Sequence, residues 1–215
     1  MLDDWGELVL AAGALGTAAF GIVEGLKWLP FVGEAGLPAM LRLLGLALQS
    51  ALATAYGDDF VRMLRAQYRG DQENFAKVVR QGLRIGLTPR NAVDIASALG
   101  VVNPAMLQEA ASAVDSGATL TPEQRNAIAR FELAADARVD AGLSLAQDHY
   151  TRLAKVLAGL VAVAIAVTVA YGLKPDGSLI GWGLLVGLAA VPLAPIAKDV
   201  AGALKAATQA LRART

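Results

Sequence analysis

The sequence predicts an all-α integral membrane protein. Two transmembrane helical hairpins flank a cytoplasmic helical domain, and long helices continue out of the membrane. Two uncharged stretches, residues 156–173 and 179–197, are eighteen and nineteen residues long and are separated by a five-residue turn. The chain is 55% hydrophobic with a mean hydropathy of +0.48, which is too apolar for an ordinary soluble domain. Of its 19 basic and 19 acidic residues, twelve of each lie between residues 58 and 155, which predicts a water-exposed middle domain.

The first predicted span covers residues 7–29. Its core is a sixteen-residue uncharged run, residues 8–23. Trp5 and Trp28 lie near its two ends, where aromatic side chains favour the membrane interface, and Pro30 ends it. The segment before the run is acidic, whereas a cleavable signal peptide begins with basic residues. We therefore expect this segment to be retained as a span.

Residues 38–57 admit two interpretations. The segment is rich in leucine and alanine but carries Arg42 and Gln49. It is either the second span of a hairpin formed by residues 1–57, or an amphipathic helix lying along the cytoplasmic interface. In a hairpin, Glu24 and Arg42 reach a similar depth near the turn, where they can form an intramembrane ion pair and the arginine can extend toward the headgroups. This argument favours the span.

Residues 58–152 are predicted to form the cytoplasmic helical domain. Pro89, Pro104 and Pro122 each follow a threonine or asparagine, a pattern typical of helix starts. From residue 122 to residue 173 nothing forces the helix to stop, apart from the glycine at position 142. One helix of roughly 75 Å can therefore run from the domain into the membrane.

The second predicted hairpin covers residues 153–197, with spans at 154–173 and 179–197. At 1.5 Å per residue, each span can cross about 30 Å of hydrocarbon. Residues 198–215 are predicted to form a basic amphipathic tail helix. Its apolar stripe consists of Val200, Leu204, Ala207 and Leu211, and its basic side of Lys198, Lys205 and Arg212.

Basic residues border the predicted spans on one side. They are Arg62, Arg65, Arg69, Arg152, Lys155 and the basic residues of the tail. The positive-inside rule therefore places the middle domain and the tail in the cytoplasm. Four spans then put the amino terminus inside, whereas three spans put it outside. Arginine outnumbers lysine thirteen to six in an alanine-rich chain, which is typical of a GC-rich bacterial genome, so the expected location is a bacterial inner membrane.

Small residues recur at the spacing of helix contacts. Gly183 and Gly187 form one GxxxG motif, and Gly21 and Gly25 form another. A ladder of alanines four residues apart occupies the third span, at Ala158, Ala162, Ala166 and Ala170. Small faces let transmembrane helices approach closely. They can pack within one chain or between copies, and their number favours a homo-oligomer.

A few ionisable residues and prolines are candidates for ion conduction. In a symmetric oligomer Glu24 would form a carboxylate ring, a device that selects cations. The alternative is an ion pair of Glu24 with Arg42 or Lys27. Asp58 and Asp59 can collect cations at a pore mouth or merely cap a helix junction. Pro192 and Pro195 can form a gating hinge or a static kink.

Enzyme chemistry finds no support in the sequence. There is no cysteine, and His149 is the single histidine, so thiol catalysis and most metal sites are excluded. The sequence contains no phosphate-binding loop, dinucleotide fingerprint, nucleophile elbow or HExxH motif. Net charge is zero, which gives no electrostatic footprint for nucleic acid. We expect no catalytic residues, no metal and no cofactor.

The preferred function is a homo-oligomeric pore or ion channel of the bacterial inner membrane, with a cytoplasmic domain for assembly or gating. The alternative is a non-conducting scaffold or accessory subunit that docks a cytoplasmic protein. The layout also resembles that of the proton-driven motor proteins of the TolQ and ExbB kind, in which a cytoplasmic helical domain precedes a pair of spans that extend beyond the bilayer. This topological resemblance implies a third, weaker candidate, a stator-like subunit. The expected partners are further copies of the chain, the lipid bilayer and a cytoplasmic protein.

Overall fold

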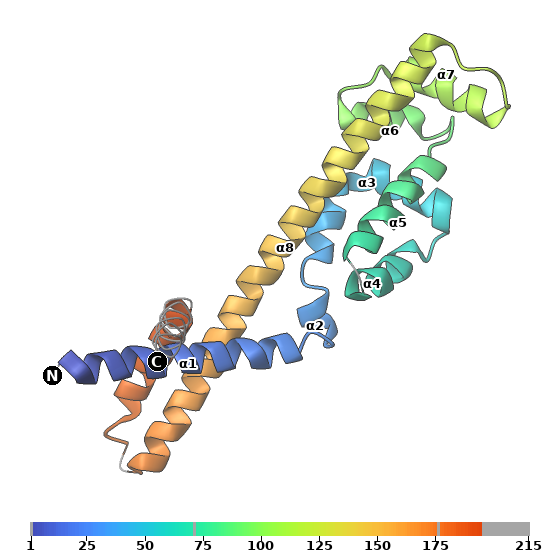
Figure 1. The fold of residues 1–215 in the computed structure, drawn as a ribbon. Helices are drawn as coiled ribbons and strands as arrows, with labels where there is room; N and C mark the ends of the chain where they lie inside the picture. Colours follow the sequence, from blue (N-terminus) through green and yellow to red (C-terminus); the bar gives the residue numbers. More distant parts are fainter. Residues whose placement is uncertain (1, 71, 176, 195–215) are drawn as a thin grey trace, which may run out of the picture. The chain divides into compact units, whose positions relative to one another are not determined.

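The computed structural model describes residues 2–70, 72–175 and 177–194, and these residues are helical with no strand among them (Figure 1). The all-α prediction is thereby confirmed. The chain divides into two compact units. We call residues 33–150 the helical unit. The three-helix unit consists of the described residues up to Val32 and from Thr151 onward.

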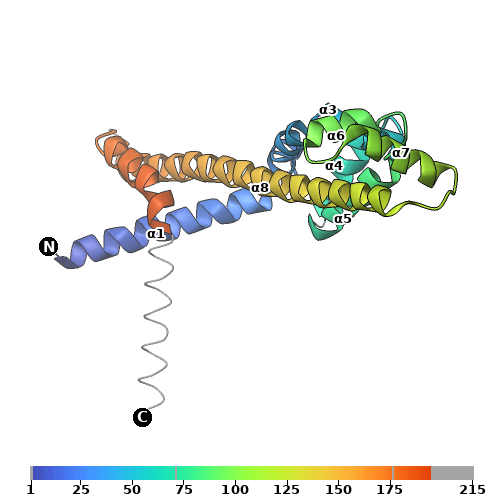
Figure 2. The ribbon, with the colours of Figure 1, turned by 90° about the horizontal axis from the view of Figure 1, so that it is seen from above.

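The helical unit contains five helices and the first part of a sixth. Figures 1 and 2 both show α3 to α7 gathered beside the first part of α8. The helices are α3 (Leu37–Tyr56), α4 (Phe60–Gly70), α5 (Gln72–Ile85), α6 (Ala92–Leu99), α7 (Pro104–Asp115) and α8 (Pro122–Leu173). Their apolar faces form one core, in which Leu48, Phe75 and Phe131 are almost fully buried.

Side-chain caps start two of these helices where the sequence predicts. The Asn103 side chain accepts a hydrogen bond from the Met106 N–H before α7. Before α8, the Thr121 hydroxyl accepts from the Gln124 N–H, and the Gln124 side chain accepts from the Thr121 N–H. This reciprocal capping box satisfies two backbone donors that have no partner within the helix.

The start of α6 differs from the prediction, which placed it at Thr88-Pro89. The helix begins at Ala92 because the buried Asn91 side chain organises the preceding loop. Its oxygen accepts from the Thr88 N–H, and its nitrogen donates to the Gly86 carbonyl. A side chain that bonds its own loop in this way competes with helix formation.

The long helix α8 is continuous over 52 residues, about 78 Å at the standard rise. Gly142 does not interrupt it. This glycine lies where α8 crosses α3, and a Cβ atom placed on it would come within 2.9 Å of the Met40 side chain. The prediction of a single uninterrupted helix from residue 122 to residue 173 is confirmed.

Helix α3 packs in the core of the helical unit, although residues 38–57 were expected to pair with the first span. One apolar side of α3, which includes Leu44, Leu48 and Leu52, is fully buried, whereas Leu43 and Leu46 are exposed. The predicted hairpin of residues 1–57 is therefore divided between the two units. Helices α4, α5 and α6 supply apolar partners for the buried face of α3, and the pairing of residues 38–57 with the first span stays a prediction. By length and composition alone, α3 and α8 are the two described helices that could each cross a membrane.

A break at Gly45 divides α3. The residue has φ 75° and ψ 168°, a conformation that is essentially restricted to glycine. In a continuous helix the Leu41 carbonyl would accept from the Gly45 N–H. Here it accepts from the Gln49 side chain at 2.7 Å, while the nearby Leu43 carbonyl accepts from Arg138 of α8. Side chains therefore replace backbone hydrogen bonds that the break removes.

The three-helix unit is built from α1 (Leu2–Gly25), the part of α8 from Thr151 onward, and the apolar helix Ile180–Ala194. The short helix α2 (Pro30–Gly33) follows α1 at the boundary between the units. Residue 173 ends α8, and Gly177 takes the positive φ of 80° that the following turn requires. The predicted tail helix, residues 198–215, lies outside the described residues.

Candidate functional site

The predicted small-residue faces of the three-helix unit meet within the chain. A Cβ atom placed on Gly183 would lie 2.9 Å from the Ala166 carbonyl oxygen and 3.1 Å from Ala170 Cβ. One placed on Gly187 would lie 2.5 Å from Val163 Cα. Among the other predicted packing residues, Ala158 and Ala162 are fully buried. The helix Ile180–Ala194 thus uses its GxxxG face to approach the backbone of α8.

A further close contact was missed at the sequence level. Gly16 of α1 lies against the helix Ile180–Ala194, and a Cβ atom on it would overlap the Ala190 carbonyl oxygen. Gly16 belongs to no GxxxG motif. The available signal was the helical spacing of Ala12, Gly16, Ala19 and Val23, which the structure shows to be a buried stripe of α1.

Gly21 and Gly25, which do form a GxxxG motif, make no such contact. No heavy atom lies within 4 Å of a Cβ atom placed on either glycine. Both residues are exposed. This face of α1 is open within the part of the chain that the structure describes.

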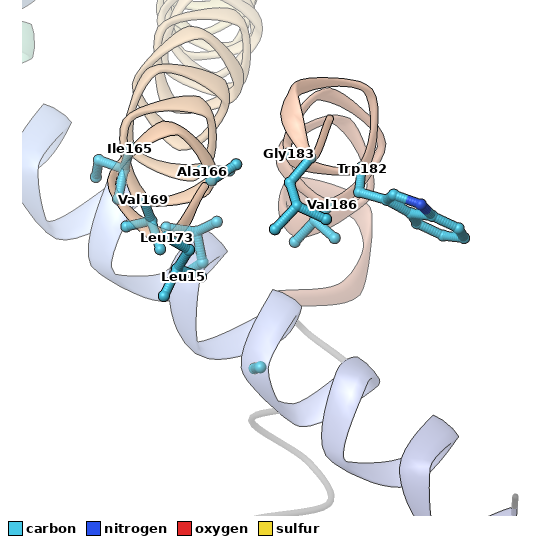
Figure 3. A pocket seen from close by; sticks show the side chains of 11 residues that line it. Leu15, Ile165, Ala166, Val169, Leu173, Trp182, Gly183 and Val186 are labelled. Atoms are coloured by element: carbon cyan, nitrogen blue, oxygen red, sulfur yellow. The ribbon is translucent and has the colours of Figure 1, made fainter. Parts of the chain in front are cut away.

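An apolar cavity of about 300 Å³ lies between α1, α8 and the helix Ile180–Ala194. Figure 3 shows Leu15, Val169 and Leu173 beside Gly183 and Val186 at this cavity. No charged side chain is among the residues that line it: Ala11, Leu15, Ile165, Ala166, Val169, Ala170, Leu173, Leu179, Trp182, Gly183 and Val186. The cavity favours apolar ligands and offers no charged group to an ion.

Glu24 forms an ion pair with Lys27, with 2.5 Å between the Lys27 Nζ and the Glu24 Oε2 atoms. Both side chains are about half exposed, at 52% and 51%. This is one of the two alternatives to a carboxylate ring that the sequence left open. Arg42, the other proposed partner, is an exposed residue of the helical unit, and its pairing with Glu24 stays a prediction.

Asp58 and Asp59 are exposed residues at the junction between α3 and α4. They directly precede the first residues of α4, where the helix dipole stabilises negative charge. Pro192 lies in the helix Ile180–Ala194 and is exposed, whereas Pro195 lies outside the described residues. His149 is exposed on α8. No group of three or more potential metal ligands occurs among the described residues.

An ion-pair ladder joins α5 to α8 and was not predicted. Arg80 pairs with Asp136 and Asp140, and Arg84 pairs with Glu132 and Asp136. The signal was present, because the arginines are four residues apart and so are the three acids. Such a network orders partly exposed side chains together, which makes it more effective than isolated surface pairs.

Two further sets of polar contacts lie near α3, one made by Arg138 and the other by Glu34. The Arg138 guanidinium donates to the Ala98 carbonyl at 3.2 Å and to the Leu43 carbonyl at 3.5 Å, which connects α8 to α6 and α3. Glu34, whose side chain is only 14% exposed, forms ion pairs with Arg65 and Arg69 of α4. These contacts hold the helical unit together at points where its apolar core ends.

A groove lies at the break in α3. It has a volume of about 400 Å³ and is lined by Leu46, Ala47 and Ser50 of α3 together with Asn91 and Asp94. Leu46, the residue after the break, is 86% exposed. The groove therefore combines one exposed apolar side chain with the polar residues Ser50, Asn91 and Asp94.

Comparison with known proteins gives no match to any family model, to any curated protein or to any solved structure. The geometry of the two units therefore carries the functional inference.

Proposed function

We propose that this chain is a membrane-anchored, non-conducting scaffold or accessory subunit. The three-helix unit lies in the bilayer, and the helical unit docks a partner protein on the cytoplasmic side. The observation that carries the proposal is the cavity between the three helices of the three-helix unit, which no charged side chain lines. Ion pathways use rings of charged groups or backbone carbonyls, and a scaffold needs neither.

The exposed surface of the three-helix unit supports its place in the bilayer. Leu160, Leu185 and Leu188 each expose more than 60% of their surface. Large exposed apolar side chains on both α8 and the helix Ile180–Ala194 are compatible with contact to lipid. Of the described helices in this unit, α8 could span a membrane by length and composition, and residues 10–25 of α1 and the helix Ile180–Ala194 are shorter apolar helices.

The proposed topology has three spans: α1, the last part of α8 and the helix Ile180–Ala194. Helix α3 belongs to the helical unit, where its apolar face is already covered. An odd number of spans places the amino terminus opposite the helical unit. The acidic residues Asp3, Asp4 and Glu7 then lie outside, and the arginines that follow α3 remain inside, as the positive-inside rule requires.

Ion flux separates a scaffold from a channel. The purified chain is reconstituted in liposomes that contain a pH- or cation-sensitive dye, with gramicidin as a positive control. We expect the same dye response as in empty liposomes, and no change on Glu24→Gln, because the Glu24 carboxylate is paired with Lys27 at the surface. Flux that the wild type supports and Glu24→Gln abolishes would instead establish a pore.

The groove at the break in α3 is the proposed docking surface of the scaffold. A photo-crosslinking amino acid at position 46 tests it in living cells, and the same amino acid at the exposed Thr54 of α3 is the matched control. We expect one discrete adduct from position 46 and none from position 54. Equal labelling at both positions, or none at either, would contradict docking at this groove.

The homo-oligomeric pore remains a second candidate because of one observation. The Gly21 and Gly25 face of α1 is open, and an unoccupied GxxxG face favours association between copies. Native mass spectrometry of the solubilised chain distinguishes the two. A single closed oligomer that is lost on Gly21→Leu would favour the pore, and a monomer would favour the scaffold.

A further inference from the structure

The cavity of the three-helix unit is open to the surface. Small residues from all three helices line it, namely Ala11, Ala170 and Gly183. Trp182, Val169 and Leu173 line it and are also 66%, 54% and 71% exposed, respectively, so the cavity continues onto the face that lipid would cover. The lining atoms lose dispersion contacts unless an apolar group enters the cavity.

The cavity is large enough for part of one acyl chain and too small for a complete lipid. At about 300 Å³, it lies at the low end of the roughly 300–1,000 Å³ that is usual for ligand pockets. A linear hydrocarbon can enter between the helices while its headgroup stays at the interface.

The turn after α8 carries one basic residue, Lys174, and one acidic residue, Asp176, of which Asp176 lies outside the described residues. Lys174 directly follows the lining residue Leu173 and is exposed. It is the one basic residue between Lys155 and Lys198, and no ion pair of Lys174 occurs among the described residues. Tyr171 and Trp182 are exposed near it along the chain, as expected of aromatic residues at the headgroup level. A basic residue at this level attracts an anionic headgroup.

We propose that this cavity binds one acyl chain of an anionic phospholipid, whose phosphate is held at the interface by Lys174. The inference rests on the proposed place of the three-helix unit in the bilayer, but it does not depend on whether the chain is a scaffold or a pore. The lipid fills the space that small residues leave between the three helices, and so makes the unit complete.

Native mass spectrometry tests the site on the intact chain. The protein is inserted into nanodiscs with equal amounts of phosphatidylglycerol and phosphatidylcholine that carry identical acyl chains, and is then released in the gas phase. We expect one retained phosphatidylglycerol per chain. Retention of no lipid, equal retention of both lipids, or a lipid-free dimer in which a second copy covers the cavity would each overturn the proposal.

Matched variants locate the lipid. Ala11→Phe fills the cavity from α1, whereas Ala14→Phe adds the same ring to an exposed position of that helix outside the cavity. We expect at least a tenfold loss of bound lipid for Ala11→Phe and none for Ala14→Phe. Equal losses, or no loss from either variant, would overturn the site. The wild-type measurement decides the proposal even if a variant fails to fold.

The headgroup has its own pair of variants. Lys174→Gln should abolish the preference for phosphatidylglycerol, and Lys155→Gln, at an exposed lysine of α8, should keep it. A preference that survives Lys174→Gln would contradict the phosphate contact. A chain that does not insert into nanodiscs at all would overturn the bilayer placement itself, whereas a chain that inserts without bound phosphatidylglycerol would overturn only the lipid site.

Discussion

At the scale of single residues, close backbone approach determines how the helical unit packs. Gly82 and Gly86 lie four residues apart and face α3. A Cβ atom on Gly86 would overlap the Ala51 carbonyl oxygen, and one on Gly82 would overlap the Tyr56 ring. The Tyr56 hydroxyl in turn donates to the Val78 carbonyl at 2.7 Å. Any side chain at either glycine would force α3 and α5 apart.

We therefore expect Gly86→Ala to lower the free energy of unfolding by about 1–3 kcal/mol, the usual cost of forcing extra atoms into a packed core. Gly70→Ala is the control, because no heavy atom lies within 4 Å of a Cβ atom at that position. Urea unfolding of the solubilised chain, followed by far-ultraviolet circular dichroism, measures both. Equal stability of the two variants would contradict the close contact between α3 and α5.

The second prediction at this scale concerns Tyr68, whose ring packs edge-on against Phe75 with 5.2 Å between the ring centroids. Burial raises the pKa of the Tyr68 hydroxyl above its ordinary value of 10.0. The unfolded chain therefore loses this proton first as pH rises. The contribution of the neutral, buried Tyr68 hydroxyl to the stability of the fold is fully present below about pH 10. It is lost as pH rises through the pKa of the folded state.

We expect the free energy of unfolding to decline above about pH 10, and to decline less steeply in Tyr68→Phe, which keeps the ring but removes the ionisable hydroxyl. Urea unfolding at a series of pH values between about 7 and 11 provides the comparison. An identical decline in both proteins would show that Tyr68 does not contribute to the alkaline loss of stability.

At the scale of elements, the last part of α8 and the helix Ile180–Ala194 form a close antiparallel pair. Their contact depends on Gly183 and Gly187, which lie over Ala166, Ala170 and Val163. A turn of a few residues joins the two helices, so they meet with little loss of chain entropy. The small faces that favoured contacts between copies are thus occupied within one chain at these positions.

The absence of cysteine makes this pairing easy to test. Ala170→Cys combined with Gly183→Cys should form an intramolecular disulfide. The two Cβ positions are 3.1 Å apart, and a shift of a few tenths of an ångström brings them to the separation of about 3.5–4.5 Å that disulfides need. Gly172→Cys with Gly183→Cys is the control, since Gly172 has no heavy atom within 4 Å of a Cβ atom. Non-reducing electrophoresis should show an oxidised monomer for the first pair only. A covalent dimer would place these faces between copies.

At the scale of the whole molecule, the number of spans depends on whether α3 crosses the membrane. The four-span prediction pairs α3 with α1, whereas one apolar side of α3 is buried within residues 33–150. Apolar surface that protein already removes from water gains little further free energy when the helix enters lipid. The proposed three-span topology follows from this packing.

The two topologies predict opposite locations for the amino terminus. With Asp4→Cys in the cysteine-free chain, a membrane-impermeant maleimide should label intact cells if there are three spans. With four spans it should label only after permeabilisation. Ser178→Cys, in the turn after α8, should be labelled from outside under both topologies and serves as the control. If the maleimide labels the Asp4→Cys variant only after permeabilisation, the result would support the four-span topology.

The sequence by itself determined the features that depend on local chemistry. The capping box at Thr121 and the cap at Asn103 fix where α8 and α7 begin. The absence of any breaker predicts the continuity of α8. The charge-free runs identify the apolar end of α8 and the helix Ile180–Ala194. Each of these signals lies within a few turns of one helix, so a single sequence is sufficient to read it.

Only the tertiary structure decided which apolar and small faces meet. It assigned α3 to the helical unit, brought Gly16 against Ala190 and left Gly21 and Gly25 open. Periodicity shows that a helix has an apolar face, but a protein core and a lipid tail satisfy that face equally well. The choice between them depends on surfaces supplied by residues far away in the chain, which is why the sequence pattern alone left it open.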